Sequence, residues 1–181
     1  RLSFYLAIKQ LGGGTLTLRP NELHLGEGGE SLEDTAKIIS TYGDGFMLRT
    51  DKDEKIEKFR KYLSIPLING LSPSSHATQV LSDIFTVEEL KNKPISKLNI
   101  TWIGDSNNVL NSLIAASVKF KFKLNIGCPS NYKPKKFVLD WVKNNKRKIY
   151  IYNDPKKAVI NSDVIFSDKV ISLNDKVNKK K

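Results

Sequence analysis

The 181-residue sequence has few of the residues that build disulfide frameworks, metal centres and membrane spans. Its single cysteine cannot form a disulfide within the chain, which fits a reducing compartment and predicts a cytoplasmic protein. His24, one of only two histidines, has no cysteine or acidic residue at metal-ligand spacing, so no metal site is expected there. No apolar run approaches the roughly 20 residues needed to cross a bilayer, so no membrane partner is expected.

Signatures of nucleotide and nucleic-acid binding are also missing. The glycine-rich segments 12–14 and 26–29 match neither a Walker loop nor a dinucleotide fingerprint. Aromatic residues, 9% of the chain, are not interleaved with basic residues as on a single-strand-binding surface. Cys128 precedes Pro129 with no paired base, which favours a small buried residue over a nucleophile. We therefore expect no nucleic-acid partner.

Positive charge, by contrast, is abundant and unevenly distributed. The net charge is +11; residues 1–118 hold 13 Lys/Arg and 14 Asp/Glu, whereas residues 119–181 hold 17 and 5. A basic half of this kind can attract nucleic acid, an acidic membrane surface or small anions. The ordinary explanation is a set of solvated lysines in a Lys- and Asn-rich sequence.

Alternating helical and strand patterns predict an α/β protein. Helices are expected over residues 3–11, 32–42, 53–63, 76–90, 108–120, 135–144 and 155–160. Strands are expected over residues 15–18, 45–48, 65–68, 98–103, 123–126, 148–152 and 163–166. Ser31 and Asp34 suggest a capping box, and residues 69–75 a loop. Such alternation implies parallel sheets with helices on both faces.

The helix breaker around Pro94 suggests two successive open-sheet domains, at residues 1–90 and 91–181. Residues 1–4 are expected to lie in a helix rather than in a secretory signal. Because the sequence does not begin with Met, we expect the chain to start inside a longer protein or gene.

His76 and Gln79 are candidate site residues at the beginning of a predicted helix. Their spacing of three residues brings them to one face, where free backbone N–H groups favour anions. Both side chains could donate hydrogen bonds to a carbonyl oxygen on which charge develops. The alternative is a histidine that caps the helix beside an ordinary polar neighbour.

Arg49 follows an apolar strand, where its guanidinium could hold a phosphate or carboxylate in a bidentate manner. The alternative is a surface salt bridge with Asp51 or Asp53. Neither interpretation is favoured by the sequence.

Polar side chains also follow two later strands. Asn107 and Asn108 come after residues 98–103, and Asp168 after residues 163–166. Because open α/β sheets bind ligands at the carboxyl ends of their strands, the amides could face a ligand and the carboxylate an ammonium group. Helix capping by asparagine and a loop-starting aspartate are the structural alternatives.

Several short motifs, in this order along the chain, resemble those of the ornithine carbamoyltransferases. They are Arg-x-Ser at residues 1–3, Gly-Glu-Ser-x-x-Asp-Thr-Ala at 29–36, Pro-x-x-Asn-Gly-Leu at 66–71, His-x-x-Gln at 76–79 and Gly-Asp-x-Asn-Asn at 104–108. The last motif is closer to the ornithine enzyme than to its aspartate relative. The resemblance covers nearly the whole chain.

The resemblance implies transfer of a carbamoyl group from carbamoyl phosphate to ornithine, giving citrulline and phosphate, with no metal or organic cofactor. It implies that Arg49 and His76 are catalytic and bind carbamoyl phosphate together with Gln79. It implies an ornithine site formed by Asn108, Asp168, Ser172 and Leu173. It also implies a homotrimer.

The family's first phosphate-binding segment would precede Arg1, and its later His-Cys-Leu-Pro segment would follow Lys181. We therefore expect a copy that is truncated at both ends, with both domains incomplete. Two alternatives stay open: a non-catalytic anion-binding or interaction module, and a transcarbamylase that uses another amine.

Overall fold

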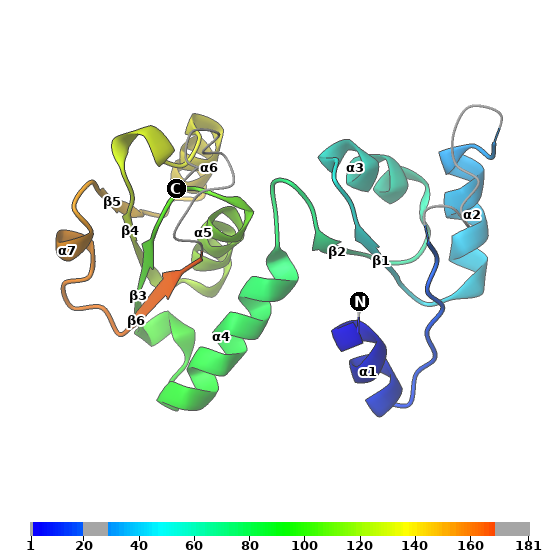
Figure 1. The fold of residues 1–181 in the computed structure, drawn as a ribbon, viewed down its shortest axis with the longest axis horizontal. Helices are drawn as coiled ribbons and strands as arrows, with labels where there is room; N and C mark the ends of the chain where they lie inside the picture. Colours follow the sequence, from blue (N-terminus) through cyan, green and yellow to red (C-terminus); the bar gives the residue numbers. More distant parts are fainter. Residues whose placement is uncertain (1, 20–28, 169–181) are drawn as a thin grey trace, which may run out of the picture. The chain divides into compact units, whose positions relative to one another are not determined.

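The computed structural model describes residues 2–19 and 29–168, which belong to two compact units (Figure 1). The smaller unit comprises Arg1–Phe46 and Glu57–Leu67, and the larger comprises Met47–Ile56 and Ile68–Lys181. In the described parts of the chain, no helix is long and apolar enough to span a membrane.

The smaller unit is built around helix α2, Leu32–Tyr42, whose beginning has the expected capping box. The Ser31 hydroxyl accepts a hydrogen bond from the Asp34 backbone N–H at 3.1 Å and donates one to its carboxylate at 2.7 Å. Helix α1, Leu2–Gln10, has no buried residue. Helix α3, Asp53–Tyr62, buries Phe59, whose ring centroid lies 5.4 Å from that of Phe46.

Strands β1, Phe46–Arg49, and β2, Leu67–Leu71, form a two-stranded sheet, and most of their residues belong to the larger unit. Gly70 allows the close approach of these strands. A Cβ at this position would collide with Met47 Sδ and lie 3.4 Å from the Leu48 carbonyl oxygen.

A four-stranded parallel sheet forms the centre of the larger unit, in the order β5-β4-β3-β6. Its strands are β3 (Asn99–Ile103), β4 (Lys123–Gly127), β5 (Tyr150–Tyr152) and β6 (Val164–Ser167). Ile100 of β3 pairs with Leu124 on one side and Val164 on the other. Because the strands are parallel, all four carboxyl ends lie at one edge and all four amino ends at the other.

Helices lie on both faces of this sheet. The helices are α4 (Ala77–Lys91), α5 (Asn108–Phe120), α6 (Lys136–Asn144) and α7 (Pro155–Ala158), with short 3₁₀ turns at Ile95–Lys97 and Ser130–Tyr132. Helix α7 packs on β4 and β5 across the sheet from α5, which also contacts α4 and α6 (Figure 1). The core contains Trp102, Leu110 and Phe122, all at most 2% exposed. The larger unit thus confirms the expected α/β fold.

Two local predictions were wrong. Residues 15–18 form no strand in the described chain, and Leu16 is 74% exposed. Strand β2 begins two residues later than expected and continues through Asn69–Leu71, which had been assigned to a loop. Asparagine and glycine favour turns in isolation, but here the contact of Gly70 with β1 decides the local structure.

Candidate active site

The candidate site lies in the larger unit, where polar residues follow the carboxyl ends of β1, β3 and β6. Arg49 is the last residue of β1, Asn107 and Asn108 follow β3, and Asp168 follows β6. The Asn107 amide nitrogen donates a hydrogen bond to the Asp168 carboxylate at 2.7 Å. Residues 61 positions apart therefore meet at one edge of the parallel sheet.

The two adjacent asparagines have different roles. Asn107 is the N-cap of α5, and its side-chain oxygen accepts hydrogen bonds from the backbone N–H groups of Val109 and Leu110, each at 3.0 Å. Asn108 is the first residue of the helix, and its amide nitrogen donates to the Ser72 carbonyl at 3.1 Å. The capping alternative therefore holds for Asn107 but not for Asn108.

Helix α5 holds the loop that leads into α4. Besides the bond from Asn108, the Asn111 amide donates to the Ser74 carbonyl at 3.1 Å. The Ser112 hydroxyl accepts from the His76 backbone N–H at 2.8 Å. The same hydroxyl lies 3.0 Å from that of Ser75. Since Ser112 is only 6% exposed, these bonds fix the beginning of α4 at the site.

His76 occupies the N-cap position of α4, but its side chain makes no capping hydrogen bond. Its Nδ1 lies 3.5 Å from the Thr78 hydroxyl. Partial burial lowers the pKa of His76, and the nearby Arg49 cation lowers it further, while Asp83 and Asp168 oppose both effects. The imidazole is therefore neutral near pH 7, and one ring nitrogen can donate a hydrogen bond without carrying charge.

Arg49 is exposed and forms no ion pair within residues 2–19 and 29–168. Asp51 is instead paired with Lys55 at 3.3 Å, and Asp53 accepts a hydrogen bond from the Ser74 hydroxyl at 2.7 Å. The surface salt bridge considered for Arg49 is therefore absent, and its guanidinium is open to an anionic ligand.

Gln79 is on the same helix turn as His76, but its amide nitrogen donates to the Asp83 carboxylate at 2.8 Å. To donate to a ligand it must leave that partner. Ser172 and Leu173 lie outside the described residues. Within the described segments, no group of three or more His, Cys, Asp or Glu side chains could hold a metal ion. Cys128 is buried, and burial raises the pKa of its thiol.

Ser112 and Asn111 were not identified from the sequence, although they fix the loop before His76. A serine at position 112 falls on the buried face of an apolar helix, where a hydroxyl requires a partner. That requirement is the only sequence signal that marks it.

The sequence matches two protein-family models and many known proteins. A model described as "Aspartate/ornithine carbamoyltransferase, carbamoyl-P binding domain" matches residues 1–89. Its companion, the "Asp/Orn binding domain", matches residues 96–181. The chain is 38% identical over 173 residues to an ornithine carbamoyltransferase of Brucella ovis, covering 96% of this chain and 55% of that protein. It is 41% identical over 175 residues to one of Methanocorpusculum labreanum, covering 97% and 57%.

Solved structures agree with these matches. The anabolic ornithine carbamoyltransferase from Campylobacter jejuni superposes with a TM-score of 0.86 at 34% identity, covering 99% of this chain and 60% of that one. The enzyme from Pyrococcus furiosus gives 0.84 at 34% identity, covering 98% and 57%. The chain thus spans between half and two thirds of the length of these relatives, and it belongs to the aspartate/ornithine carbamoyltransferase family.

Proposed function

We propose that this chain takes part in the transfer of a carbamoyl group from carbamoyl phosphate to the δ-amine of ornithine. In this reaction the amine nitrogen attacks the carbamoyl carbon, and the bond from that carbon to the phosphate oxygen breaks. The amine loses one proton, which the departing phosphate can accept, and the products are citrulline and phosphate.

Arg49 and His76 would hold carbamoyl phosphate. The guanidinium of Arg49, which has no ion pair among the described residues, suits a phosphate group, which it can bind through two parallel hydrogen bonds. His76 is kept neutral by burial and by Arg49, so its ring N–H can donate to the carbamoyl oxygen. That bond strengthens as the oxygen becomes negative in the tetrahedral intermediate. Gln79 would add a second donor after releasing Asp83.

Asn108 and Asp168 would hold the acceptor. The hydrogen bonds that fix these side chains use the Asn108 nitrogen and one Asp168 oxygen. A side-chain oxygen of each remains to accept from an ammonium or amine of ornithine. The two substrates would then react within one complex, where approximation supplies much of the rate. Ser172 and Leu173 would complete this ornithine site.

The observation that carries this proposal is the set of bonds from α5 to the loop before His76. They join residues matched by the carbamoyl-phosphate model to residues matched by the ornithine model. Groups suited to each substrate therefore belong to one neighbourhood of one compact unit. As a proposal, the division between the two substrate domains stays at residues 1–90 and 91–181.

The direct test is citrulline formation by the purified chain, given carbamoyl phosphate and ornithine. We expect turnover that falls at least about 100-fold in His76→Ala, because one oxyanion donor contributes about this much. Glu89→Ala, an exposed change on the same helix, is the matched control and should leave the rate unchanged.

If the chain makes no citrulline, calorimetry with carbamoyl phosphate separates the two remaining possibilities. Saturable binding that is lost in Arg49→Ala would support the non-catalytic anion-binding alternative. Absence of both turnover and binding would refute the proposed function. Comparing ornithine with putrescine in the same assay tests the choice of amine.

We also propose a cytoplasmic homotrimer. The support is the family resemblance together with the exposed apolar side chains of α1, where Leu2 is 69% and Leu6 43% exposed although the helix is largely apolar. Sedimentation velocity of the chain, with Leu6→Glu as the interface variant, tests this assembly.

A further inference from the structure

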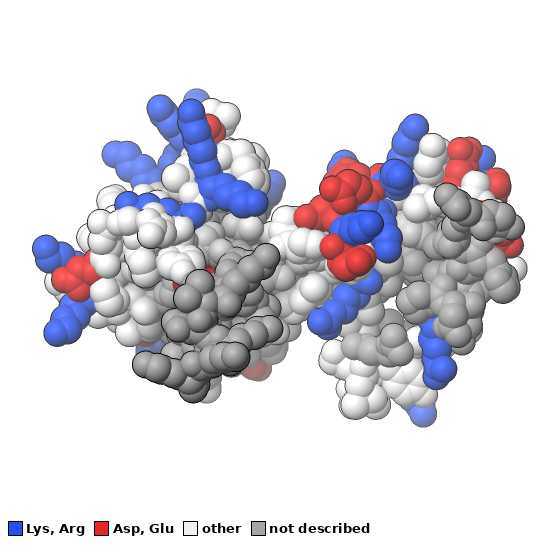
Figure 2. Space-filling view, turned by 45° about the horizontal axis from the view of Figure 1, so that its top comes forward, with Lys and Arg blue, Asp and Glu red and all other residues white. Residues whose placement is uncertain are grey.

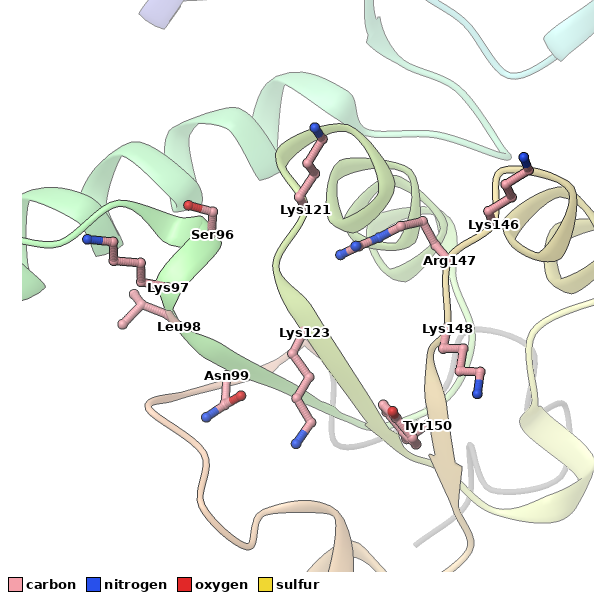
Figure 3. Close-up of a pocket in the computed structure, with 10 residues that line it drawn as sticks. All are labelled: Ser96, Lys97, Leu98, Asn99, Lys121, Lys123, Lys146, Arg147, Lys148 and Tyr150. Atoms are coloured by element: carbon pink, nitrogen blue, oxygen red, sulfur yellow. The ribbon is translucent and has the colours of Figure 1, made fainter.

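The edge of the four-stranded sheet away from the candidate active site contains a strongly basic hollow of about 450 Å³ (Figure 3). Six of the ten residues that line it are cationic: Lys97, Lys121, Lys123, Lys146, Arg147 and Lys148. They belong to the segments that precede β3, β4 and β5 or to the first residue of β4. The hollow therefore lies at the amino ends of the strands, whereas Asn108 and Asp168 follow their carboxyl ends.

Within residues 2–19 and 29–168, no carboxylate forms an ion pair with any of these six cations. The ion pairs of the described residues all lie between residues 33 and 60, far along the chain from the hollow. Asp163 reaches the same edge, but its carboxylate accepts a hydrogen bond from the Asn99 backbone N–H at 2.7 Å. Basic side chains also gather elsewhere on the larger unit: Figure 2 shows blue side chains around the part that contains α6, whereas over α3 the two signs are mixed.

Helix ends account for only part of this charge. Lys121 and Lys146 follow the last turns of α5 and α6, where the helix dipole favours a cation. Both have left-handed backbones, with φ of 62° and 54°, at positions where glycine or asparagine is the usual residue. Lys97, Lys123 and Lys148 are not at α-helix ends, so a dipole does not explain them.

Two contacts organise the hollow in advance. Arg147 donates from its guanidinium to the Phe122 carbonyl at 3.2 Å, which fixes the connection before β5 against the one before β4. The Lys123 ammonium lies 5.7 Å from the centroid of the Tyr150 ring. In Figure 3, Lys123 and Lys148 extend in the same direction, one on each side of Tyr150. Cations held together without counter-charges repel one another, and an anion between them would relieve this repulsion.

We propose that this hollow is a second anion site, which binds a small molecule carrying two or more linked phosphate groups. The volume lies within the range of small-molecule sites, roughly 300–1,000 Å³. Six cationic side chains line the hollow, more than a single phosphate requires, and Lys123 and Lys148 extend to the same side of it (Figure 3). A free polyphosphate and the phosphate chain of a nucleotide share this chemistry.

The test is calorimetric titration of the full chain with inorganic tripolyphosphate at low ionic strength, with adenosine triphosphate in a parallel titration. We expect one tripolyphosphate per chain, bound more weakly as salt increases. The double variant Lys123→Gln/Lys148→Gln should weaken binding at least tenfold. The matched control, Lys156→Gln/Lys157→Gln on α7, removes the same charge from elsewhere in the unit and should change it less than twofold.

The outcomes are distinct. If both double variants weaken tripolyphosphate binding equally, the overall positive charge explains binding and the proposal is overturned. Absence of saturable binding of either probe would also overturn it. Tighter binding of adenosine triphosphate would support it and identify a nucleotide as the source of the phosphates. If single-stranded RNA binds far more tightly than either probe and depends on the same lysines, the small-molecule site is refuted. The variant Lys123→Arg/Lys148→Arg should retain binding, which separates loss of charge from loss of folding.

This inference is independent of the proposed carbamoyl transfer. His76→Ala should leave tripolyphosphate binding unchanged, and Lys123→Gln/Lys148→Gln should leave citrulline formation unchanged. Failure of one proposal therefore does not decide the other.

Discussion

The two edges of one parallel sheet in this protein differ in both charge and connectivity. At the carboxyl ends, two amides have partners: Asn107 donates a hydrogen bond to the Asp168 carboxylate, and Asn108 donates one to the Ser72 carbonyl. At the amino ends, six cations surround a hollow without an ion pair in the described chain. The asparagines and the aspartate at the first edge have hydrogen-bond partners, whereas the cations at the second edge have no ion-pair partner among the described residues.

The difference shows how a parallel sheet places two kinds of polar residues at opposite edges. Connections from strand to helix lie at one edge and connections from helix to strand at the other, so neighbouring segments of the sequence contribute to opposite edges. Lys121 and Lys123 follow α5, while Asn107 and Asn108 begin it. Net charge alone therefore cannot indicate which ligand the protein binds, because the basic hollow and the candidate active site are on different edges.

The largest expected effect is a loss of binding of one ligand but not of the other. We expect Arg49→Ala to weaken carbamoyl phosphate binding at least about 100-fold, equivalent to about 2.7 kcal/mol, because a charged partner of the phosphate is lost. The same variant should bind tripolyphosphate normally. Calorimetry with both ligands measures this difference.

Arg60→Ala is the matched control for that experiment. Arg60 is exposed and pairs with Glu57 at 3.5 Å, an interaction of little energetic value. If Arg49→Ala and Arg60→Ala weaken the binding of both ligands equally, the two edges do not bind separate ligands and the comparison fails.

A smaller effect should come from the serine that orders the carboxyl edge. Ser112→Ala leaves the His76 N–H without its acceptor, and we expect a loss of about 1–3 kcal/mol in the free energy of unfolding together with reduced turnover. Urea denaturation and the citrulline assay measure the two changes.

The control is Ser117→Ala on the same helix. Ser117 is equally buried but donates only to the Ile114 carbonyl within α5. It should change stability less and leave turnover intact. Equal losses of turnover in both variants would mean that Ser112 acts through the helix rather than through the loop before His76.

The sequence predicted the elements whose signals are local. The helix expected over residues 108–120 has those bounds, and the Ser31–Asp34 cap forms as expected. The strand expected at residues 15–18 was wrong because a strand requires a partner that no local pattern supplies. For the same reason Asn69–Leu71 was assigned to a loop, although contact with β1 makes it a strand.

The candidate site also combines features that local sequence predicts with features that depend on distant residues. The residues proposed to bind the substrates, Arg49, His76 and Asp168, lie at strand and helix ends that the periodicity of the sequence predicts. Which partner each one takes depends on residues far along the chain: Ser112 reaches back 36 positions to His76. Gln79 shows the opposite case, because its partner Asp83 is only four positions away and competes with any ligand. Sequence patterns thus indicate where polar groups gather, but not which of their hydrogen-bonding atoms are already used.

The smallest expected effect is a shift in the titration of His76. Burial is the main cause of its lowered pKa and Arg49 the second, so Arg49→Gln should raise that pKa without restoring it fully. Asp83→Asn removes a group that raises it and should move it the opposite way. Proton NMR of the imidazole across pH 4–8 measures both, and shifts of the same sign would contradict this electrostatic account.

The sign of the pH dependence follows from the same shift. Because the folded-state pKa lies below the ordinary value of 6.5, the unfolded chain binds this proton first as the pH falls. The stability gained from a neutral His76 is therefore present above pH 6.5 and is lost as the pH falls through the folded-state pKa. Turnover should decline over the same acidic range, because a cationic imidazole would be repelled by the nearby Arg49 guanidinium. His76 is not among the residues that line the basic hollow, so binding of tripolyphosphate should persist where turnover declines.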